Sequence, residues 1–327
     1  MTKTAFVTGG TGFLGLNLIR QLTEQGWAVT ALHRASSDLT YLKRFPVKLV
    51  VGEIEDSASV LASMPTGLDA VFHVAGDVSF WSGHRARQVR TNVDGTRNMA
   101  QAALARGAKR FVHTSSIAVY GMQTEEFDET AQHLGLKSPI GYLRTKAQAE
   151  EEVQAAIQNG LDAVIVNPAN IVGPYDAANW GRLFRLVAEG KLPGIPPGEA
   201  PFCAVAEVAK AHLAAWYRGR TGENYLLGGT QATYLQAFQV VGKLLGHQVA
   251  DKTVPAAILK AAGWLGELRS KVTLREPQIT PEMATLLSLT LHCRSDKAIL
   301  ELGFQAVPLE TMFADCYAWL VAENLIV

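Results

Sequence analysis

Two side chains four residues apart carry the clearest chemistry in this chain of 327 residues. Tyr142 and Lys146 stand in the run Gly-Tyr-Leu-Arg-Thr-Lys, at the start of a long helical pattern, and this spacing places both on one helix face. A phenol has a pKa of about 10, so it exchanges protons poorly at neutral pH. We expect the lysine ammonium to stabilise the phenolate and to lower the pKa of Tyr142. The pair is a candidate acid/base for a substrate oxygen.

A glycine-rich turn near the start of the chain is a candidate phosphate-binding loop. The run Thr8-Gly9-Gly10-Thr11-Gly12-Phe13-Leu14-Gly15 follows a predicted strand and opens a predicted helix, which is the context that a dinucleotide-binding loop requires. Glycine permits a positive φ and lets backbone N–H groups approach a pyrophosphate at the helix N-terminus. The loop therefore predicts a bound dinucleotide.

The segment after the second predicted strand bears on which dinucleotide binds. An acid at this position binds the ribose 2′-hydroxyl of NAD, but no acid occurs here before Asp38. Arg34 can instead hold a 2′-phosphate bidentately, and Ser36 and Ser37 can add hydroxyl donors. The alternative is a solvated arginine at a strand end. We predict a preference for NADP(H) over NAD(H).

A pair of serines completes the candidate catalytic group. Ser115 and Ser116 end the fifth predicted strand, where a hydroxyl can hydrogen-bond the reacting oxygen beside a tyrosine. Taken alone, the two serines also fit a solvated strand end. The order of glycine loop, strand-end serine and Tyr/Lys helix favours the catalytic interpretation.

Short β-branched runs alternate with longer helical patterns in the first half of the chain, which predicts βαβ units and a parallel sheet. Several strands are apolar on both faces, as expected where helices cover both sides. The predicted fold is an α/β doubly wound Rossmann sheet. The predicted strands are 4–8, 28–33, 48–51, 70–74, 110–115 and 163–167, and the predicted helices are 12–25, 57–64, 87–106 and 140–159.

The alternation of strand and helix patterns ends after Pro168. Proline and glycine cluster in the runs VGPYD and KLPGIPPGEAP, which indicate loops, and the last 80 or so residues are mostly helical in pattern. We predict a dinucleotide-binding domain over residues 1–170 and a smaller, mostly helical substrate-binding cap over 171–327. A helix and a strand at about 205–228 are expected to return to the first domain's sheet.

Composition disfavours several classes of function. Thirty basic and thirty acidic residues leave no net charge, so neither nucleic acid nor an anionic membrane surface is an expected partner. Three scattered cysteines and eight histidines without metal-ligand spacing predict no disulfide framework and no metal. His73 and His113, on central strands, are expected to be hydrogen-bonded core residues. Without a signal-peptide pattern or a long apolar segment, a soluble cytoplasmic protein is expected.

The chain resembles the extended short-chain dehydrogenases/reductases, and within them the enzymes similar to dihydroflavonol 4-reductase and 3β-hydroxysteroid dehydrogenase. Besides the motifs above, four further segments support this resemblance over nearly the whole chain. They are Phe72-His73-Val74-Ala75-Gly76, Asn92-Val93-Asp94-Gly95-Thr96, the run NPANIVGP at 167–174, and Ser295-Asp296-Lys297-Ala298.

The resemblance implies hydride transfer between a nicotinamide and a ketone, aldehyde or secondary alcohol of a mainly apolar small molecule. It assigns Ser116 as the catalytic serine, with Ser115 as the fallback, beside Tyr142 and Lys146. The cofactor residues that it implies are Gly9, Thr11, Gly12, Phe13, Leu14, Gly15, Arg34, Ser36, Ser37, Glu53, Ile54, Val74, Ala75, Gly76, Asn92, Thr114, Tyr142, Lys146, Pro168 and Ile171. Candidate substrate contacts are Phe80, Trp81 and Asn170, although core packing explains the aromatic pair equally well.

Three alternatives remain at this stage. A nucleotide-sugar 4-epimerase shares the fold, but no arginine precedes the Val205 helix to hold a diphosphate, and only Arg182 and Arg185 could replace it. A sugar-nucleotide dehydratase would need an acid beside Ser116. A non-catalytic NADP-binding regulator would not need the Tyr/Lys/Ser group. The resemblance also implies a homodimer through the helices at 87–106 and 140–159, while the segment 258–268 is either a pocket lid or simple cap packing.

Overall fold

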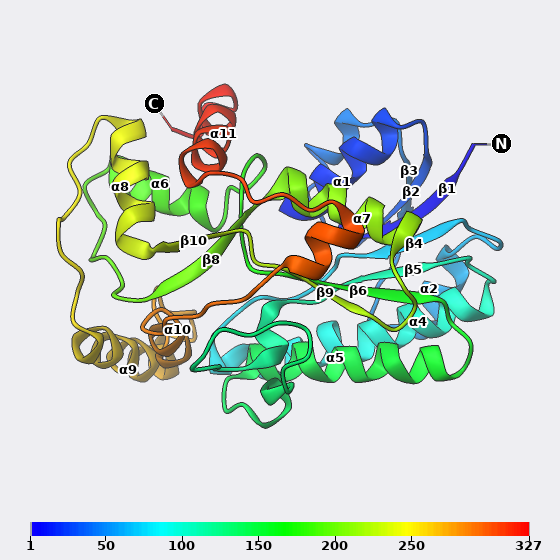
Figure 1. Ribbon diagram of the computed structural model, residues 1–327, viewed down its shortest axis with the longest axis horizontal. Coiled ribbons are helices and arrows are strands. Elements are labelled where there is room, and N and C mark those ends of the chain that lie inside the picture. The colour runs from blue at the N-terminus through cyan, green and yellow to red at the C-terminus, as the bar shows by residue number, and fades with distance from the viewer. Residues whose placement is uncertain (1, 327) are drawn as a thin grey trace.

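Seven parallel strands form the larger lobe of the computed structural model, which describes residues 2–326 (Figure 1). Their spatial order is β3-β2-β1-β4-β5-β6-β9, and every pairing is parallel. The order reverses between β1 and β4, so the carboxyl ends of these strands diverge into the crevice where such sheets bind ligands. The strands are β1 (Thr4–Thr8), β2 (Ala28–His33), β3 (Lys48–Val51), β4 (Ala70–His73), β5 (Phe111–Thr114), β6 (Ala163–Pro168) and β9 (Asn224–Leu227).

Helices cover both faces of this sheet, which confirms the predicted doubly wound fold. On one face α1 (Phe13–Glu24) and α7 (Val205–Arg218) pack together, and on the other lie α2 (Ser57–Ser63), α4 (Gly95–Ala105) and α5 (Gly141–Gln158) (Figure 1). Successive strand residues point to opposite faces: Val7 belongs to the core under α1, and Phe6 to the core under α4. Two separate apolar cores therefore fix the sheet from both sides.

One predicted helix differs in its course. The pattern at 87–106 predicted a continuous helix, but the chain forms α3 (Arg85–Gln88), a π-helical segment (Val89–Asp94) and then α4. Such wide turns often lie at functional sites, and this one carries Asn92, which hydrogen-bonds both backbone groups of Asp77. Apolar periodicity does not reveal that contact, so the sequence could not place the wide turn.

The second lobe contains a sheet that the sequence analysis missed. Strands β7 (Asn170–Val172), β8 (Glu199–Ala204) and β10 (Thr230–Thr233) form it in the order β10-β8-β7. The run KLPGIPPGEAP was predicted as loop because proline and glycine cluster in it, but its last residues, from Glu199, begin β8. Pro201 is accommodated because β7 pairs with β8 only from Phe202 onward.

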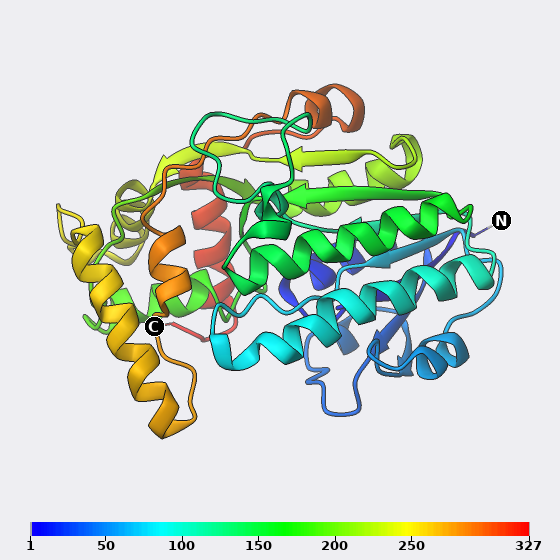
Figure 2. The same cartoon turned by 90° about the horizontal axis from the view of Figure 1, so that it is seen from below.

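Five helices surround this small sheet: α6 (Trp180–Ala188), α8 (Tyr234–Leu245), α9 (Ala256–Thr273), α10 (Pro281–Leu286) and α11 (Leu309–Ala322). An aromatic cluster fills the core between the small sheet and the helices α6, α8 and α11, where the ring centroids of Trp180 and Phe313 lie 4.7 Å apart. Figure 2 shows α9 along the outer edge of this lobe, far from the N-terminus. The region is helical as predicted, but built around a sheet.

Strand β9 and helix α7 bring the later chain back to the larger lobe. β9 pairs with β6 at the edge of the large sheet, and α7 packs beside α1. The boundary near residue 170, which divides the chain into two domains, stays a prediction.

Candidate active site

The glycine loop joins β1 to α1, and two of its glycines stand where no side chain fits. Gly9 has a φ of 70°, and a Cβ there would lie 2.7 Å from the backbone nitrogen of Ala75. A Cβ at Gly15 would lie 2.1 Å from the carbonyl oxygen of Gly9. Gly12 is the N-cap of α1, where no side chain caps the first turn. The free N–H groups of that turn are able to hydrogen-bond a phosphate, as the sequence analysis expects.

The end of β4 lies against this loop. His73 Nδ1 is 2.8 Å from the Thr8 hydroxyl, and the next two residues, Val74 and Ala75, lie directly beside Gly9. Asn92 is buried and accepts from Asp77 N at 2.7 Å while it donates to Asp77 O at 3.0 Å. Its side chain is thus engaged within the protein, and it holds the loop in place rather than offering a free amide.

The turn after β2 presents an unpaired guanidinium. Arg34 is exposed and forms no ion pair within residues 2–326. Ser37 Oγ accepts from the Arg34 backbone at 3.2 Å, and Ser36 is exposed beside it. The Asp38 carboxylate accepts from Thr40 N and Oγ1 at 2.9 and 2.6 Å, which lowers the pKa of Asp38. The acid nearest Arg34 in sequence is therefore engaged elsewhere.

The end of β3 supplies the other predicted adenine-side residues. Glu53 is exposed, and its backbone N–H donates to Ser59 Oγ at 3.0 Å. Ile54 is half-buried, and a Cβ at Gly95 would lie 2.9 Å from its Cδ1 atom. Both residues thus lie at the carboxyl end of the strand next to β2.

The candidate catalytic residues converge at the start of α5. Tyr142 is half-buried, and its phenol lies near enough to the side chain of Ser116 for that side chain to lower its pKa. Ser116 is also half-buried and directly follows β5. Ser116 Oγ also accepts from Ala118 N at 3.2 Å, which fixes the hydroxyl at the head of a short helical turn. Ser115 is buried, and its hydroxyl has no partner within the described residues. Of the two serines, Ser116 is the one beside the phenol.

The electrostatics of Tyr142 differ from the sequence expectation. Burial raises the pKa of this phenol, the side chain of Ser116 opposes the rise, and the negative charge of Asp77 adds to it. The pKa of Tyr142 is therefore raised, not lowered, so the expected direction of the shift is wrong for this structure. The Lys146 ammonium is buried and donates to the Thr114 carbonyl oxygen at 2.8 Å.

A buried carboxylate, which the sequence analysis missed, stands behind Lys146. Burial lowers the pKa of Lys146 to about 8, and the charge of Glu150, one turn further along α5, opposes that shift. Glu150 accepts from Asn167 Nδ2 at 2.6 Å and from Asn224 Nδ2 at 2.9 Å. Asn167 also donates to the backbone oxygen of Ser116 at 3.3 Å. The available signal was the four-residue spacing from Lys146, which puts Glu150 on the same helix face.

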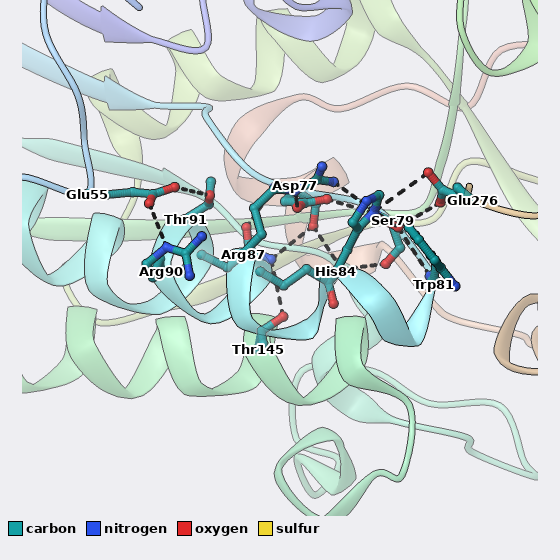
Figure 3. Close-up of polar contacts among 12 residues, drawn as sticks. Glu55, Asp77, Ser79, Trp81, His84, Arg87, Arg90, Thr91, Thr145 and Glu276 are labelled. Atoms are coloured by element: carbon teal, nitrogen blue, oxygen red, sulfur yellow. Dashed lines mark hydrogen bonds and ion pairs between the residues drawn. The ribbon is translucent and has the colours of Figure 1, made fainter. Parts of the chain in front are cut away.

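The loop after β4 carries the predicted aromatic substrate contacts, and the structure separates them. Phe80 lies edge-on to Tyr142, with ring centroids 5.2 Å apart. Trp81 turns toward the second lobe and donates through Nε1 to Ser270 Oγ at 3.1 Å. Figure 3 shows the polar contacts that hold this loop, which involve Asp77, Ser79, Trp81, His84, Arg87 and Glu276.

Residues after β6 complete the surroundings. Pro168 is buried and Ile171 is half-buried. Asn170 Nδ2 donates to the Pro201 carbonyl oxygen at 3.1 Å, so this predicted substrate contact joins β7 to β8. Its amide is therefore committed to the small sheet.

The two arginines that could hold a substrate phosphate behave differently. Arg185 donates to the Ala177 carbonyl oxygen at 2.8 Å. Arg182 is half-buried and forms no ion pair in the part of the chain that the structure describes. Asp176 is buried and caps α6 by accepting from Trp180 N at 2.9 Å.

The two central histidines differ in their hydrogen bonding. His73 has a partner at each ring nitrogen, with Nε2 lying 3.0 Å from Thr96 Oγ1. His113 has none at either nitrogen among residues 2–326, so the prediction of a hydrogen-bonded core residue is wrong for His113. Its ring stacks on His73 at 5.5 Å, and burial holds the pKa of His113 well below its usual value. Both rings are therefore neutral.

Comparison with known proteins agrees with this geometry. The sequence profile of the NAD dependent epimerase/dehydratase family matches residues 5–228. The chain belongs to this family. As an extended short-chain dehydrogenase/reductase, it is 33% identical over 98% of its length to a putative dihydroflavonol 4-reductase from Synechocystis, covering 95% of that protein. It is 32% identical to the sterol demethylase protein B of Methylococcus capsulatus, over 99% of this chain and 100% of that one.

A solved structure extends the likeness to three dimensions. The crystal structure of gox2253 superimposes with a TM-score of 0.84 at 29% identity and covers 100% of both chains. The family binds a nicotinamide cofactor. In this chain the residues fit such a cofactor: the loop is closed to side chains at Gly9 and Gly15, the first turn of α1 is uncapped, and Lys146 lies one helical turn from Tyr142.

Proposed function

We propose that this protein transfers a hydride between NADP(H) and a carbonyl, or the matching secondary alcohol, of a mainly apolar small molecule. The observation that carries the proposal is the placement of Tyr142 beside Ser116, with the ring of Phe80 edge-on to its own. These residues lie at the carboxyl ends of the parallel strands, as the glycine loop does. A bound nicotinamide supplies or accepts the hydride at carbon.

The chain's own residues handle the oxygen. In reduction, the carbonyl oxygen accepts a hydrogen bond from Ser116 and then the proton of Tyr142, while the carbonyl carbon gains the hydride. The product is the alcohol, and the resulting phenolate takes a proton from solvent. Because burial raises the pKa of Tyr142, the phenol is fully protonated at neutral pH, which suits the acid role in reduction. Oxidation needs the phenolate, which an added positive charge nearby would stabilise further.

The proposed preference for NADP(H) is supported by the β2 turn. Arg34 is exposed and free of ion pairs within residues 2–326, and Ser36 and Ser37 lie beside it. A guanidinium binds a phosphate through paired hydrogen bonds, whereas an exposed arginine gains little from a ribose hydroxyl.

The direct test is NADPH oxidation over a panel of ketones and aldehydes, with Tyr142→Phe as the matched control. We expect turnover of apolar carbonyls and a loss of roughly 10²–10⁴-fold in kcat for the variant. Turnover that Tyr142→Phe leaves intact would rule out the proposed acid. Bound NADPH that no carbonyl oxidises would favour the non-catalytic regulator.

A nucleotide-sugar 4-epimerase is the second candidate, and Arg182 is the observation that favours it. This half-buried guanidinium has no ion pair within the described residues, so it is free to bind a phosphate. Against it, the segment of β8 before α7 carries no arginine. Nucleotide sugars in the same panel separate the two, because an epimerase converts them without net consumption of cofactor.

Two further expectations belong with this proposal. A homodimer would form through α4 and α5, whose exposed sides Arg97 and Glu152 link by hydrogen bonds of 2.7 and 2.9 Å. Mass measurement in solution tests this assembly. A cytoplasmic location suits an enzyme that uses NADPH, and fractionation of cells tests it.

A further inference from the structure

Helix α9 exposes a series of large apolar side chains that the fold leaves uncovered. The exposed fractions are 59% for Ile258, 69% for Trp264, 70% for Leu265, 63% for Leu268, 85% for Val272 and 80% for Leu274, which follows the helix. Single exposed hydrophobic residues are common on proteins, but a row of them at helical spacing marks a surface that binds something.

These side chains share one side of α9. The buried residues Leu259, Gly263 and Ser270 face the protein, and Gly263 lies so close to Thr280 that a Cβ would approach its carbonyl oxygen to 2.8 Å. At about 100° per residue, Leu265, Leu268 and Val272 point the opposite way. The apolar face is therefore directed straight outward, at the edge of the lobe seen in Figure 2.

Cations flank this face. By the same helical spacing, Lys260 and Lys271 lie on one side of it and Arg269 on the other, and Arg275 follows the helix end. None of the four forms an ion pair with another residue of the described chain. Exposed large hydrophobic residues with unpaired lysine and arginine at their margins are the pattern of a helix that lies in a lipid headgroup layer.

The acidic side chain of α9 is turned away from this surface. Glu267 is half-buried and accepts from the Ser82 hydroxyl. Residues 256–275 thus hold four basic residues and one acidic residue in a chain with no net charge overall. The neutral total, from which the sequence analysis predicted no contact with an anionic membrane surface, hides this local excess.

The loop at residues 80–82 contacts both the inner side of α9 and the candidate active site. Trp81 donates to Ser270 at 3.1 Å, Ser82 binds Glu267, and the adjacent Phe80 lies against Tyr142. The inner side of α9 is therefore joined to the candidate acid by a single short stretch of chain.

We propose that α9 binds the surface of an anionic lipid bilayer, with Trp264, Leu265 and Leu268 at the headgroup boundary and the flanking cations on lipid phosphates. No helix within residues 2–326 is both long and apolar enough to cross a bilayer, so the proposed contact is one with the surface alone. If an apolar substrate reaches the active site from this face, that role rests on the proposed function.

Co-flotation with lipid vesicles tests the surface without any turnover. The protein is mixed with vesicles of phosphatidylcholine alone or with about 30% phosphatidylserine, and the bound fraction gives a partition coefficient. We expect binding to the anionic vesicles that weakens in high salt. The double variant Trp264→Ser/Leu268→Ser should lower the coefficient at least about tenfold, because both side chains lose their apolar contact.

Two controls keep the test decisive. Leu300→Ser changes an 84% exposed apolar side chain outside α9 and should leave binding unchanged. Lys260→Gln/Lys271→Gln should weaken binding to anionic vesicles only.

The proposal is overturned if the unaltered protein stays unbound at low salt, or if Trp264→Ser/Leu268→Ser binds equally well. It is also overturned if these changes abolish only self-association in ultracentrifugation, which would make the face an interface between two copies. Absence of carbonyl turnover alongside normal flotation would refute the proposed function alone.

Discussion

Replacing Glu150 with glutamine removes the charge that opposes the loss of the Lys146 proton. The pKa of Lys146 is about 8, lowered by burial and raised by Glu150. Residues four apart on a helix have Cβ atoms about 5–6 Å apart, and unit charges at about 6 Å interact by roughly 2–3 kcal/mol at an effective dielectric constant of about 20. Allowing for relaxation, Glu150→Gln should lower the pKa of Lys146 by about 1–2 units.

The assay is the pH profile of kcat/KM for NADPH, which reports the free enzyme. If the cationic form of Lys146 is the active one, activity falls as the pH rises through its pKa. The alkaline limb should therefore move from a pH of about 8 to about 6–7 in Glu150→Gln. Glu151→Gln removes an exposed carboxylate from the next position of α5 and should leave the limb in place. An unmoved limb in Glu150→Gln would refute the electrostatic role of this buried acid.

Stability gives an independent measurement on the same variant. Both carboxylate oxygens of Glu150 accept from asparagines, so an amide would turn its NH₂ group toward one of these donors. We expect a loss of about 1–3 kcal/mol in the free energy of unfolding, measured by denaturant titration. Glu150→Asp keeps the negative charge, so the alkaline limb of its pH profile should stay at a pH of about 8 even where the free energy of unfolding falls.

Three further predictions address the cofactor and the serine. Arg34→Asp should raise the KM for NADPH roughly 10–100-fold through lost charged hydrogen bonds, while the KM for NADH stays equal or falls, as initial rates with each cofactor will show. Ser116→Ala should lower kcat by about 10²-fold or more. Ser115→Ala removes a buried hydroxyl that has no partner in the described chain, so it should leave kcat within about threefold. The reverse ranking of these two kcat values would make Ser115 the catalytic serine. Gly15→Ala should abolish cofactor binding in fluorescence titration and lower the melting temperature, because its Cβ would lie 2.1 Å from a backbone oxygen.

The sequence predicted those features of the site that are set by local spacing. The glycine loop occupies one continuous turn, and the Tyr142/Lys146 spacing defines a helix face, so both were recognisable before folding was considered. The doubly wound sheet followed from the alternation of strands and helices.

What could not be predicted depends on contacts between distant segments. The amides on Glu150 come from Asn167 and Asn224, which lie 17 and 74 residues further along the chain. The direction of the pKa shift of Tyr142 depends on burial, which no local pattern reports. The small sheet was missed because β7 has three residues and β8 contains a proline.

The hydrogen bonds of His73 have a consequence for how the enzyme responds to acid. Ala75 N–H donates to the Thr8 hydroxyl at 3.3 Å, so that hydroxyl is free to donate a hydrogen bond to His73 Nδ1. The single proton of the His73 ring then lies on Nε2, which faces Thr96. Burial lowers the pKa of His73 to about 3, so the ring stays neutral at mildly acidic pH. The neutral imidazole therefore keeps joining Thr8, at the start of the glycine loop, to Thr96 of α4 as the pH falls, so mild acid should leave the shape of that loop unchanged.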